Sequence, residues 1–204
     1  ELEEITDFPQ LLKSNPGLLG LNVTIPYKKV ILPYLHEASD GVQNIGACNC
    51  IKIIDGRLHG FNTDATAFSQ SLLPQLQPHH TKALVLGSGG AAKAVQFALT
   101  GSNIDFKIVS RSAEAGLNYQ QLSPQVMNQH LLIINTTPLG MFPNTEAPAI
   151  SYDLLTPKHF LFDLIYNPEK TPFLEKGEQA GAQIANGAEM LVLQAEASWN
   201  IWNS

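Results

Sequence analysis

Short apolar runs alternate with stretches of helical periodicity from about residue 81 onward. Residues 82–87 (KALVLG) are apolar almost throughout, which is typical of a strand buried on both faces. The next stretch, 91–100, has the pattern of a helix, and Gly101 is placed to end it. Further strands are expected at 105–111, 130–137, 159–167 and 182–187, with a helix at 171–181. This alternation predicts βαβ units around a parallel sheet, the α/β class.

The earlier part of the chain has a different pattern. Strands at 47–55 and 57–63 are joined through Asp55-Gly56, a strong short-range signal for a hairpin. We also expect helices at 8–15 and 27–39 and a strand at 18–25. A helix that begins at Asp64 is expected to bridge toward the second part. The last stretch, 188–202, is apolar on more than one face of a helix, so we expect other elements to clasp it.

Composition bounds the kinds of partner. The 204-residue chain is 44% hydrophobic and 15% charged, enough for one large domain or two small ones with real cores. Its formal net charge of -6 argues against nucleic acid or an anionic membrane, because both attract basic surfaces. We therefore expect a small-molecule substrate, no nucleic acid and no membrane. No apolar run approaches the ~20 residues that span a bilayer, and the acidic start is unlike a signal peptide, so a cytoplasmic location is the simplest interpretation.

Two cysteines and two histidines are the obvious residues to consider for a metal. Cys48 and Cys50 are one residue apart, too close for an ordinary disulfide, and zinc requires three or four ligands. We expect both to be reduced and packed. His79 and His80 are expected to be exposed residues of a linker. The sequence therefore predicts no metal site.

A glycine-rich turn follows the strand at 82–87 directly. Gly87, Gly89 and Ala92 occupy the three positions of the G-x-G-x-x-[G/A] motif, between a strand and a helix. Gly87 permits the tight turn, Gly89 lets a pyrophosphate approach the backbone, and Ala92 lets the helix pack on the strand. The pattern indicates a dinucleotide site, while a glycine turn that binds no ligand remains the alternative.

The end of the second strand bears on which dinucleotide is bound. A site that prefers NAD usually has a carboxylate there, which accepts hydrogen bonds from the ribose 2′-hydroxyl. Here the position reads Ser110-Arg111-Ser112, whereas Asp105 lies at the other end of the strand and Glu114 lies beyond it. A guanidinium beside hydroxyls suits a 2′-phosphate, so the sequence favours NADP (NADPH) as cofactor. An ordinary surface arginine is the alternative for Arg111.

Polar clusters interrupt the apolar first part at or near the ends of predicted strands. They consist of Asn22, Thr24 and Lys28, of Asn49, and of Asn62, Thr63 and Asp64. Loops at strand ends commonly bring such side chains into a crevice between two units. A lysine amine and an aspartate carboxylate in one crevice can act as a proton-transfer pair. Taken singly, Asp64 also fits a helix N-cap, Lys28 a solvated charge and Asn49 a turn residue.

Seven motifs, in one order, resemble the shikimate dehydrogenase family. They are NVTIPYKK, GACN, GFNTDATAF, LGSGGAAKAV, INTTPLGM, DLIYNPEKTPFL and NGAEMLVLQA, and they extend over essentially the whole chain. The resemblance implies an oxidoreductase that reversibly reduces 3-dehydroshikimate to shikimate with NADPH, in the shikimate pathway of aromatic amino acid biosynthesis. Quinate is the alternative substrate within the family. A catalytically silent nucleotide-binding module of the same fold is the alternative from another class.

The resemblance also assigns roles to single residues. Lys28 of the N-V-T-x-P-x-K motif would be the catalytic lysine, and Asp64 of N-T-D its partner. The substrate would be bound by Thr24, Asn49, Tyr166 and Gln194. The cofactor would be bound by Gly87, Ser88, Gly89, Gly90, Ala91, Ser110, Arg111, Ser112, Thr136, Thr137, Leu164, Gly187 and Met190, and Asp40 falls at a further cofactor position. Of these, Thr136, Thr137 and Met190 would lie near the nicotinamide.

The implied architecture has two α/β domains. Residues 1–64 would form an incomplete substrate-binding domain that residues 188–204 complete, and residues 65–187 a Rossmann-like NADP-binding domain. The family normally opens with a βα segment whose serine-x-serine pair holds the substrate carboxylate. Nothing here matches that segment, so we expect the chain to start after it. The oligomeric state, monomer or homodimer, is left open.

Two further positions depart from the family pattern. In the cofactor loop the family's N-R-T reads Ser110-Arg111-Ser112, and a position that is often basic is Ala115, which implies one phosphate contact fewer. The preference for NADP over NAD is then expected to be smaller. Cys50 replaces a common threonine after Asn49, for which we expect an effect on packing only.

Overall fold

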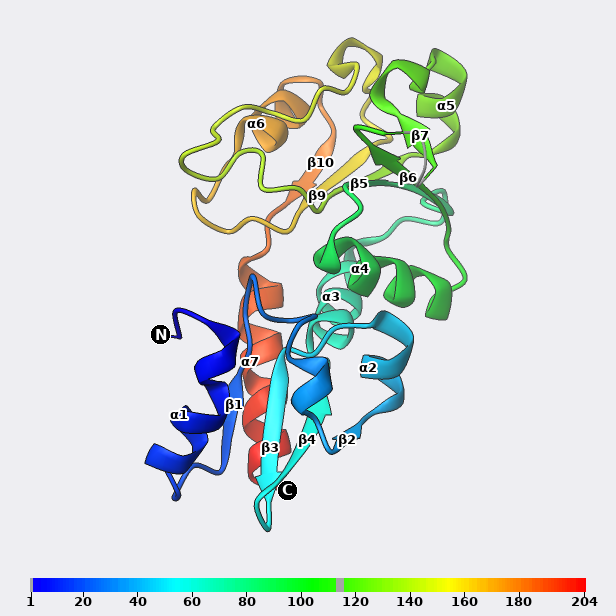
Figure 1. Ribbon diagram of the computed structural model, residues 1–204. Coiled ribbons are helices and arrows are strands. Elements are labelled where there is room, and N and C mark those ends of the chain that lie inside the picture. Colours follow the sequence, from blue (N-terminus) through cyan, green and yellow to red (C-terminus); the bar gives the residue numbers. More distant parts are fainter. Residues whose placement is uncertain (1, 113–115) are drawn as a thin grey trace.

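A computed structural model of the chain describes residues 2–112 and 116–204. Its strands form two separate sheets, one of four strands from the first part of the chain and one of six strands from the rest. The sheets lie at opposite ends of the molecule, with helices between them and a long C-terminal helix that runs beside the smaller sheet (Figure 1). The expected α/β class, with a larger and a smaller unit, is confirmed.

The larger sheet is parallel throughout and has the Rossmann strand order. Its strands are β5 (Lys82–Leu86), β6 (Asp105–Ser110), β7 (Leu117–Asn118), β8 (Leu132–Asn135), β9 (Phe160–Asp163) and β10 (Gln183–Ala185). Neighbours follow the order β10-β9-β8-β5-β6-β7, so the winding reverses between β5 and β8. Ligands bind outside the carboxyl ends of the strands at such a switch point. Every strand expected from residue 82 onward is confirmed, while the two-residue β7 has no clear sequence signal.

Helices cover both faces of the larger sheet. α4 (Gly90–Gly101) packs on one face through Val95 and Leu99, and α5 (Pro124–Gln129) and α6 (Pro172–Gln179) pack on the other. The central strands are therefore buried on both sides, as their continuous apolar runs predict. The helices expected at 91–100 and 171–181 are confirmed.

The smaller sheet is built around the expected hairpin. Its strands are β1 (Gly20–Asn22), β2 (Glu37–Ala38), β3 (Cys50–Ile54) and β4 (Arg57–Phe61), in the order β1-β3-β4-β2. β3 and β4 are antiparallel, and both turn residues between them have positive φ, 49° at Asp55 and 73° at Gly56. α1 (Phe8–Ser14) places Phe8 in the core of this sheet beside Ile31 and Ile51.

The helix expected at 27–39 is wrong. The segment forms successive turns, the 3-10 helix η2 (Leu32–Tyr34) and then β2. Pro33 explains the difference, because proline lacks the amide donor that a continuing α-helix requires. The structure adds α2 (Asp40–Ile45), which Ser39 caps by accepting a hydrogen bond from the Val42 amide. Other 3-10 helices are η1 (Ile5–Asp7), η3 (Leu73–Gln75), η5 (Tyr119–Gln121) and η6 (Tyr152–Leu154).

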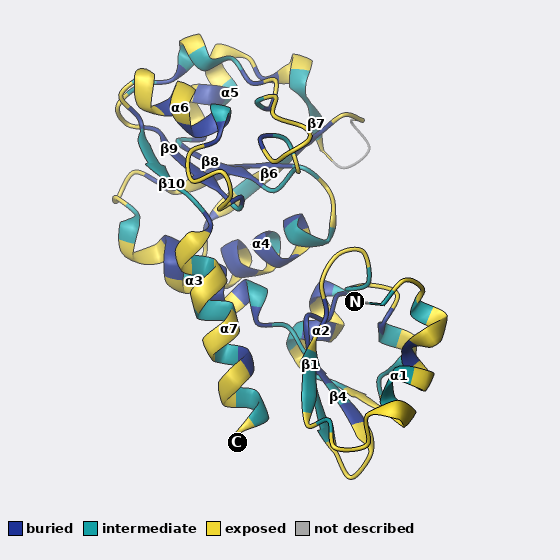
Figure 2. Ribbon diagram, turned by 90° about the vertical axis from the view of Figure 1, so that its left-hand side faces the viewer, coloured by how far each residue is buried: buried dark blue, intermediate teal, exposed yellow. Residues whose placement is uncertain are grey.

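Two helices connect the halves. α3 (Asp64–Leu72) begins at the expected residue and contacts both α4 and α7 (Ala188–Trp202). α7 also contacts β3, where the Trp202 indole N–H donates to the Ile51 carbonyl at 3.0 Å. The expectation that other elements clasp α7 is wrong. It packs through one face, and the opposite face leaves Val192 55% and Trp199 63% exposed (Figure 2).

Both cysteines and one of the two adjacent histidines are buried in the interior. Both cysteines are free and buried, as expected. His79 is exposed, but the expectation for His80 is wrong, because its ring is buried and accepts a hydrogen bond from the Gln77 amide. Within residues 2–112 and 116–204, no helix has the length and apolar character to cross a membrane, and no cluster of His, Cys, Asp and Glu could hold a metal ion.

Candidate active site

An ion pair between Lys28 and Asp64 forms the centre of the candidate site. Lys28 lies in the turns after β1, and Asp64 is the first residue of α3. The Lys28 ammonium donates a hydrogen bond to Asp64 Oδ2 at 2.8 Å, and the two side chains are 26% and 14% exposed. The fold therefore holds the pair while leaving it in reach of solvent, which suits proton transfer.

Asn49 fixes the aspartate of this pair from the other side. Its side-chain amide donates to Asp64 Oδ1 at 3.0 Å and to Thr63 Oγ1 at 2.9 Å, and its carbonyl oxygen accepts from the Thr63 amide at 2.7 Å. Asn49 is buried, so little water competes for these bonds. Thr63, not Asp64, is the N-cap residue of α3, so the helix-cap alternative for Asp64 does not hold.

α7 docks against this cluster through its backbone. Thr63 Oγ1 donates to the Gln194 carbonyl at 3.1 Å, and the buried Ser198 hydroxyl donates to the same carbonyl at 2.9 Å. The Gln194 side chain, one helical turn after Met190, donates to the Leu191 carbonyl at 3.0 Å. The C-terminal helix therefore brings residues that are distant in sequence close to Lys28 and Asp64.

The glycine turn after β5 has the shape of a phosphate-binding turn. Gly87 has a φ of 109°, and a Cβ atom there would stand 2.7 Å from Thr136 Oγ1, so glycine is required. Around Gly89, by contrast, nothing lies within 4 Å of the point where a Cβ would stand. Gly89 is the N-cap of α4, so this open space adjoins the free amides of a helix N-terminus, which favour an anion. The residues present fit a dinucleotide pyrophosphate.

The segment after β6 contains the residues expected to contact the ribose. Arg111 and Ser112 are exposed, and Arg111 follows the strand directly. Ser110 is buried, and its hydroxyl donates to the Ser112 carbonyl, so this donor is already engaged. Glu114 and Ala115 lie outside the described residues. The Arg111 guanidinium is the group here that suits a 2′-phosphate.

Three buried polar residues that sequence reasoning missed join the ends of β8 and β9. Asp163 accepts hydrogen bonds from Asn135 Nδ2 at 3.0 Å, from Thr171 Oγ1 at 2.6 Å and from the Ile165 amide at 3.0 Å. Burial raises the pKa of the Asp163 carboxyl from 3.8 to about 6, although these hydrogen bonds act to lower it. The available signal was a polar residue at the end of each apolar strand, in INTTPLGM and in DLIYNPEKTPFL.

The residues expected at the nicotinamide end surround this network. The Thr136 and Thr137 hydroxyls donate inward, to the Leu86 carbonyl at 2.6 Å and to Asn135 Oδ1 at 2.7 Å. Gly187 packs so closely on Leu164 that a Cβ atom would overlap the Leu164 carbonyl. The ends of β8 and β9 and the start of α7 are thus joined by hydrogen bonds beside the switch point between β5 and β8.

Comparison with known proteins identifies the family. Residues 1–51 match the family model of the shikimate dehydrogenase substrate binding domain. The shikimate dehydrogenase (NADP(+)) of Caldicellulosiruptor bescii is 35% identical over 219 residues, which covers 99% of this chain and 76% of that protein. This chain belongs to the shikimate dehydrogenase family.

Solved shikimate dehydrogenases share the fold. The crystal structure of the Aquifex aeolicus protein has a TM-score of 0.87 at 31% identity and covers 100% of this chain and 78% of its own. The Thermus thermophilus protein, in complex with NADP(H) and shikimate, has a TM-score of 0.85 at 31% identity and covers 98% of this chain and 78% of its own. The resemblance inferred from the seven motifs is confirmed.

The other residues assigned by resemblance to shikimate dehydrogenases are more accessible. Thr24 and Tyr166 are exposed, Tyr166 to 50%, so a ligand can reach both side chains. Asp40 is exposed at the start of α2. Lys29, next to the assigned lysine, is also exposed, and its Cε lies 3.8 Å from the point where a Cβ on Gly90 would stand.

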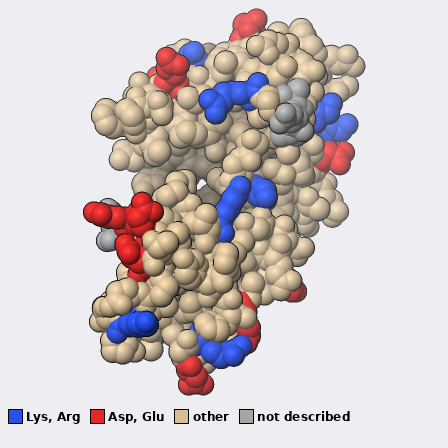
Figure 3. All heavy atoms as spheres, in the orientation of Figure 1, with Lys and Arg blue, Asp and Glu red and all other residues tan. Residues whose placement is uncertain are grey.

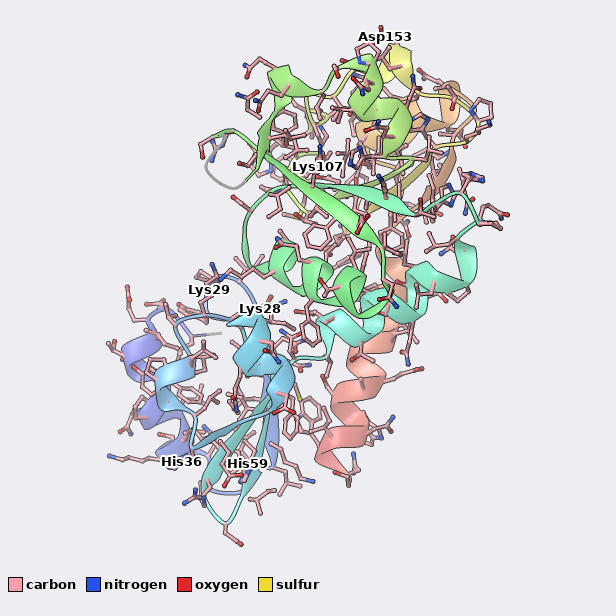
Figure 4. The ribbon with its side chains drawn as sticks, turned by 90° about the vertical axis from the view of Figure 1, so that its right-hand side faces the viewer. Lys28, Lys29, His36, His59, Lys107 and Asp153 are labelled. Carbon is pink, nitrogen blue, oxygen red and sulfur yellow. The ribbon has the colours of Figure 1, made fainter. Side chains whose placement is uncertain are left out.

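Figures 3 and 4 show where these groups lie in this member of the shikimate dehydrogenase family. Figure 3 shows a hollow between the two halves of the molecule, with lysine and arginine atoms beside it. Figure 4 shows Lys28 and Lys29 at the end of the smaller half that faces α4, whereas His36 and His59 lie at its opposite end. The Lys28–Asp64 pair therefore lies on the side of the smaller half that faces the larger sheet.

Proposed function

We propose that this protein catalyses the NADP-dependent, reversible reduction of 3-dehydroshikimate to shikimate. The observation that carries the proposal is the Lys28–Asp64 pair, 2.8 Å apart, in a chain whose glycine turn fits a pyrophosphate. A module that only binds nucleotides has no use for such a proton-transfer pair. Membership of the family and the Thermus thermophilus relative in complex with NADP(H) and shikimate support the same reaction.

The two halves are assigned separate roles. Residues 1–64 together with residues 188–204 are proposed as the substrate-binding domain, and residues 65–187 as the NADP-binding domain. The match of residues 1–51 to the substrate-binding family model supports the first assignment. The return of α7 to β3 and to the Thr63 hydroxyl supports its inclusion.

Lys28 is proposed to handle the proton of the reaction. NADPH, when bound, supplies a hydride to the carbonyl carbon of 3-dehydroshikimate. The Lys28 ammonium donates a proton to the carbonyl oxygen as that oxygen gains negative charge, and the neutral amine regains a proton from solvent, to which it is 26% exposed. In the reverse direction the neutral amine accepts the hydroxyl proton. Asp64 keeps the Lys28 nitrogen in place through its hydrogen bond.

Substrate binding is assigned to Thr24, Asn49, Tyr166 and Gln194. Both amide hydrogens of Asn49 already bind Thr63 and Asp64, so Asn49 can offer the substrate only the second lone pair of its carbonyl oxygen. Asn49 is therefore expected to accept a hydrogen bond from a substrate hydroxyl. The Gln194 amide uses one hydrogen on Leu191, which leaves its other hydrogen and its oxygen for the substrate.

Cofactor binding is assigned to residues that follow the carboxyl ends of the parallel strands β5, β6, β8, β9 and β10. The turn from Gly87 to Ala91 would hold the pyrophosphate, and Ser110 to Ser112 would hold the ribose phosphate, with Arg111 as the cation. The nicotinamide end is assigned to Thr136, Thr137, Leu164, Gly187 and Met190. Because the hydroxyls of Thr136 and Thr137 donate internally, they are not expected to donate to the ring.

We also infer a cytoplasmic location. Both cysteines are free and buried, which fits a reducing compartment. The proposed partner is the small-molecule substrate, and monomer or homodimer stays a prediction.

The proposed function is tested by adding shikimate and NADP to the purified chain and following NADPH formation by its near-ultraviolet absorbance. Turnover is expected, with kcat/KM for NADP exceeding that for NAD by about tenfold or more, because one charge-assisted contact accounts for at least that factor. Quinate replaces shikimate in a parallel assay to settle the substrate. If NADPH binds and neither substrate is oxidised, the chain is a silent module and the proposal fails.

A further inference from the structure

Asp163 is a buried charge that the proposed reaction does not use. Its side chain is 0% exposed, and Asn135 and Thr171, which donate to it, are equally inaccessible. Among the described residues, no lysine, arginine or histidine lies within ion-pair distance of it. The titratable group that faces it from a neighbouring element is Tyr152 of η6. Within the part of the chain that the structure describes, the Asp163 carboxylate is therefore stabilised by hydrogen bonds from neutral donors and by no cation.

Each donor comes from a different segment around the nicotinamide end. Asn135 ends β8, and its amide also donates to the Leu139 carbonyl, while its oxygen accepts from the Thr137 amide and hydroxyl. Through Asn135, Asp163 therefore holds the loop that carries Thr136 and Thr137.

A second branch runs through Ile165 to α7. The Ile165 amide donates to Asp163 Oδ1 at 3.0 Å, and the Ile165 carbonyl accepts from the Gly187 amide at 3.1 Å. Gly187 is the N-cap of α7, which carries Met190 and Gln194. Two hydrogen bonds in series therefore connect the carboxylate to the start of α7, so the carboxylate helps to fix where α7 begins.

The third branch runs through Thr171, the N-cap of α6. Its hydroxyl donates to Asp163 Oδ2 at 2.6 Å and accepts from the Leu174 amide. Its Cβ also stands 3.0 Å from the point where a Cβ on Gly140 would be, so it packs on the far end of the loop after β8. Both oxygens of Asp163 are therefore needed to hold all three segments.

A buried carboxylate without a cation is costly for folding, and the elevated pKa of Asp163 reflects that cost. An asparagine of the same shape would avoid the charge, but it replaces one acceptor oxygen by a donor and cannot accept from all three segments at once. Keeping a charge that opposes folding points to a requirement of the site.

We propose that Asp163 is a positioning residue that holds the nicotinamide end of the cofactor site through Asn135, Ile165 and Thr171. The inference rests on the proposed function, in that it assumes NADP as the ligand. It predicts that loss of the carboxylate weakens binding of the nicotinamide half of the cofactor and leaves binding of the adenosine half unchanged.

The test compares Asp163→Asn with the unmodified chain in two binding titrations, one with NADPH and one with adenosine 2′,5′-bisphosphate, which lacks the nicotinamide. The Kd for NADPH is expected to rise about tenfold and the Kd for the bisphosphate to stay within about twofold. Turnover is expected to fall by about a hundredfold, because a misplacement of about 1 Å has that effect. The midpoint of thermal unfolding is expected to change little, because removal of the buried charge stabilises the fold while the loss of one acceptor destabilises it. Equal weakening of both ligands with a lower midpoint would show a structural role and overturn the proposal, as would no change in either Kd.

Two more variants keep the test decisive. Thr171→Val removes one donor to Asp163 and no charge, so it should shift the ratio of the two Kd values in the same direction even if Asp163→Asn fails to fold. Asp153→Asn, an exposed aspartate in η6 of the same half (Figure 4), removes an equal charge and should change neither Kd. The titrations do not require turnover. A chain that binds NADPH but does not oxidise shikimate would contradict the proposed function, while the two Kd values would still test the role of Asp163.

Discussion

Two aspartates at the ends of secondary-structure elements have opposite surroundings. Asp64, at the start of α3, pairs with Lys28 at 2.8 Å and keeps 14% of its side chain exposed. Asp163, at the end of β9, is 0% exposed and accepts hydrogen bonds from three neutral donors. One carboxylate is held beside an accessible cation, and the other has no cation partner among residues 2–112 and 116–204.

The difference separates two uses of the same side chain. An accessible aspartate beside a lysine can keep a proton donor oriented while the proton itself exchanges with solvent. A buried aspartate surrounded by neutral donors cannot exchange protons readily, but it fixes several segments in one geometry. The Lys28–Asp64 pair is therefore assigned to the chemistry and Asp163 to positioning.

The largest effect is expected for Lys28→Ala. Removal of the proton donor should lower kcat by about a thousandfold, roughly 4 kcal/mol in activation free energy, because general acid-base groups contribute on that order. The Kd for NADPH should change less than about twofold, since the amine acts in the chemical step. Lys13→Ala, at an exposed site in the last turn of α1, is the charge-matched control and should retain activity. A large loss of NADPH affinity in Lys28→Ala would contradict the division of roles.

The next effect concerns stability and pH. The folded pKa of Asp163, about 6, lies above its ordinary value of 3.8, so the stability linked to this group is full below that ordinary value and is lost as pH rises through about 6. Between about pH 4 and about pH 7.5 the ionisation of Asp163 lowers the stability of the unmodified chain by up to about 3 kcal/mol, whereas Asp163→Asn has no such charge. The gap in unfolding free energy between Asp163→Asn and the unmodified chain should therefore shift in favour of the variant by up to that amount as the pH rises over this range. Urea unfolding at both pH values measures it, and a gap that does not vary with pH would rule out a buried charge.

A smaller effect is expected where the Asp163 network meets α7. Gly187→Ala would place a Cβ atom against the Leu164 carbonyl and should destabilise the fold by about 2 kcal/mol, the usual size of an overpacking effect. Gly17→Ala, where nothing lies within 4 Å of the added atom, is the matched control and should change the unfolding free energy by less than about 0.5 kcal/mol. Equal stability of the two variants would show that α7 can move without consequence.

The smallest effect is expected for Arg111→Ala, which touches neither aspartate. The ratio of kcat/KM for NADP to that for NAD should fall about tenfold, about 1.4 kcal/mol, with kcat nearly unchanged. Steady-state kinetics with both cofactors measure the ratio. An unchanged ratio would return Arg111 to the status of an ordinary surface arginine.

The larger sheet could be predicted from the sequence because its central strands are apolar on both faces and are bounded by glycine, proline and polar residues. The helix predicted at 27–39 is wrong, because the prediction followed the helical spacing of apolar residues and neglected the effect of Pro33. The bounds of the last helix, Ala188–Trp202, match the expected 188–202, yet its apolar periodicity did not show that only one face packs.

The candidate site was harder to predict from the sequence than the fold. Lys28 and Asp64 are 36 residues apart, and no local rule joins them. The polar clusters at strand ends suggested a shared crevice, and the motif resemblance assigned the pair its role. Asp163 was missed because one polar residue after an apolar run looks like an ordinary strand end. Its donors come from residues as far as 28 positions away, and only the packing of β8 against β9 makes them neighbours.

The central claim is that Lys28 and Asp64 act as one unit in the proton transfer. It is tested by single-turnover rates of NADPH oxidation by 3-dehydroshikimate in Lys28→Ala, in Asp64→Asn and in the double variant. Residues that act as a unit have strongly non-additive effects, so the double variant should be within about threefold of Lys28→Ala alone. If the two losses multiply instead, the residues act independently and the account is wrong.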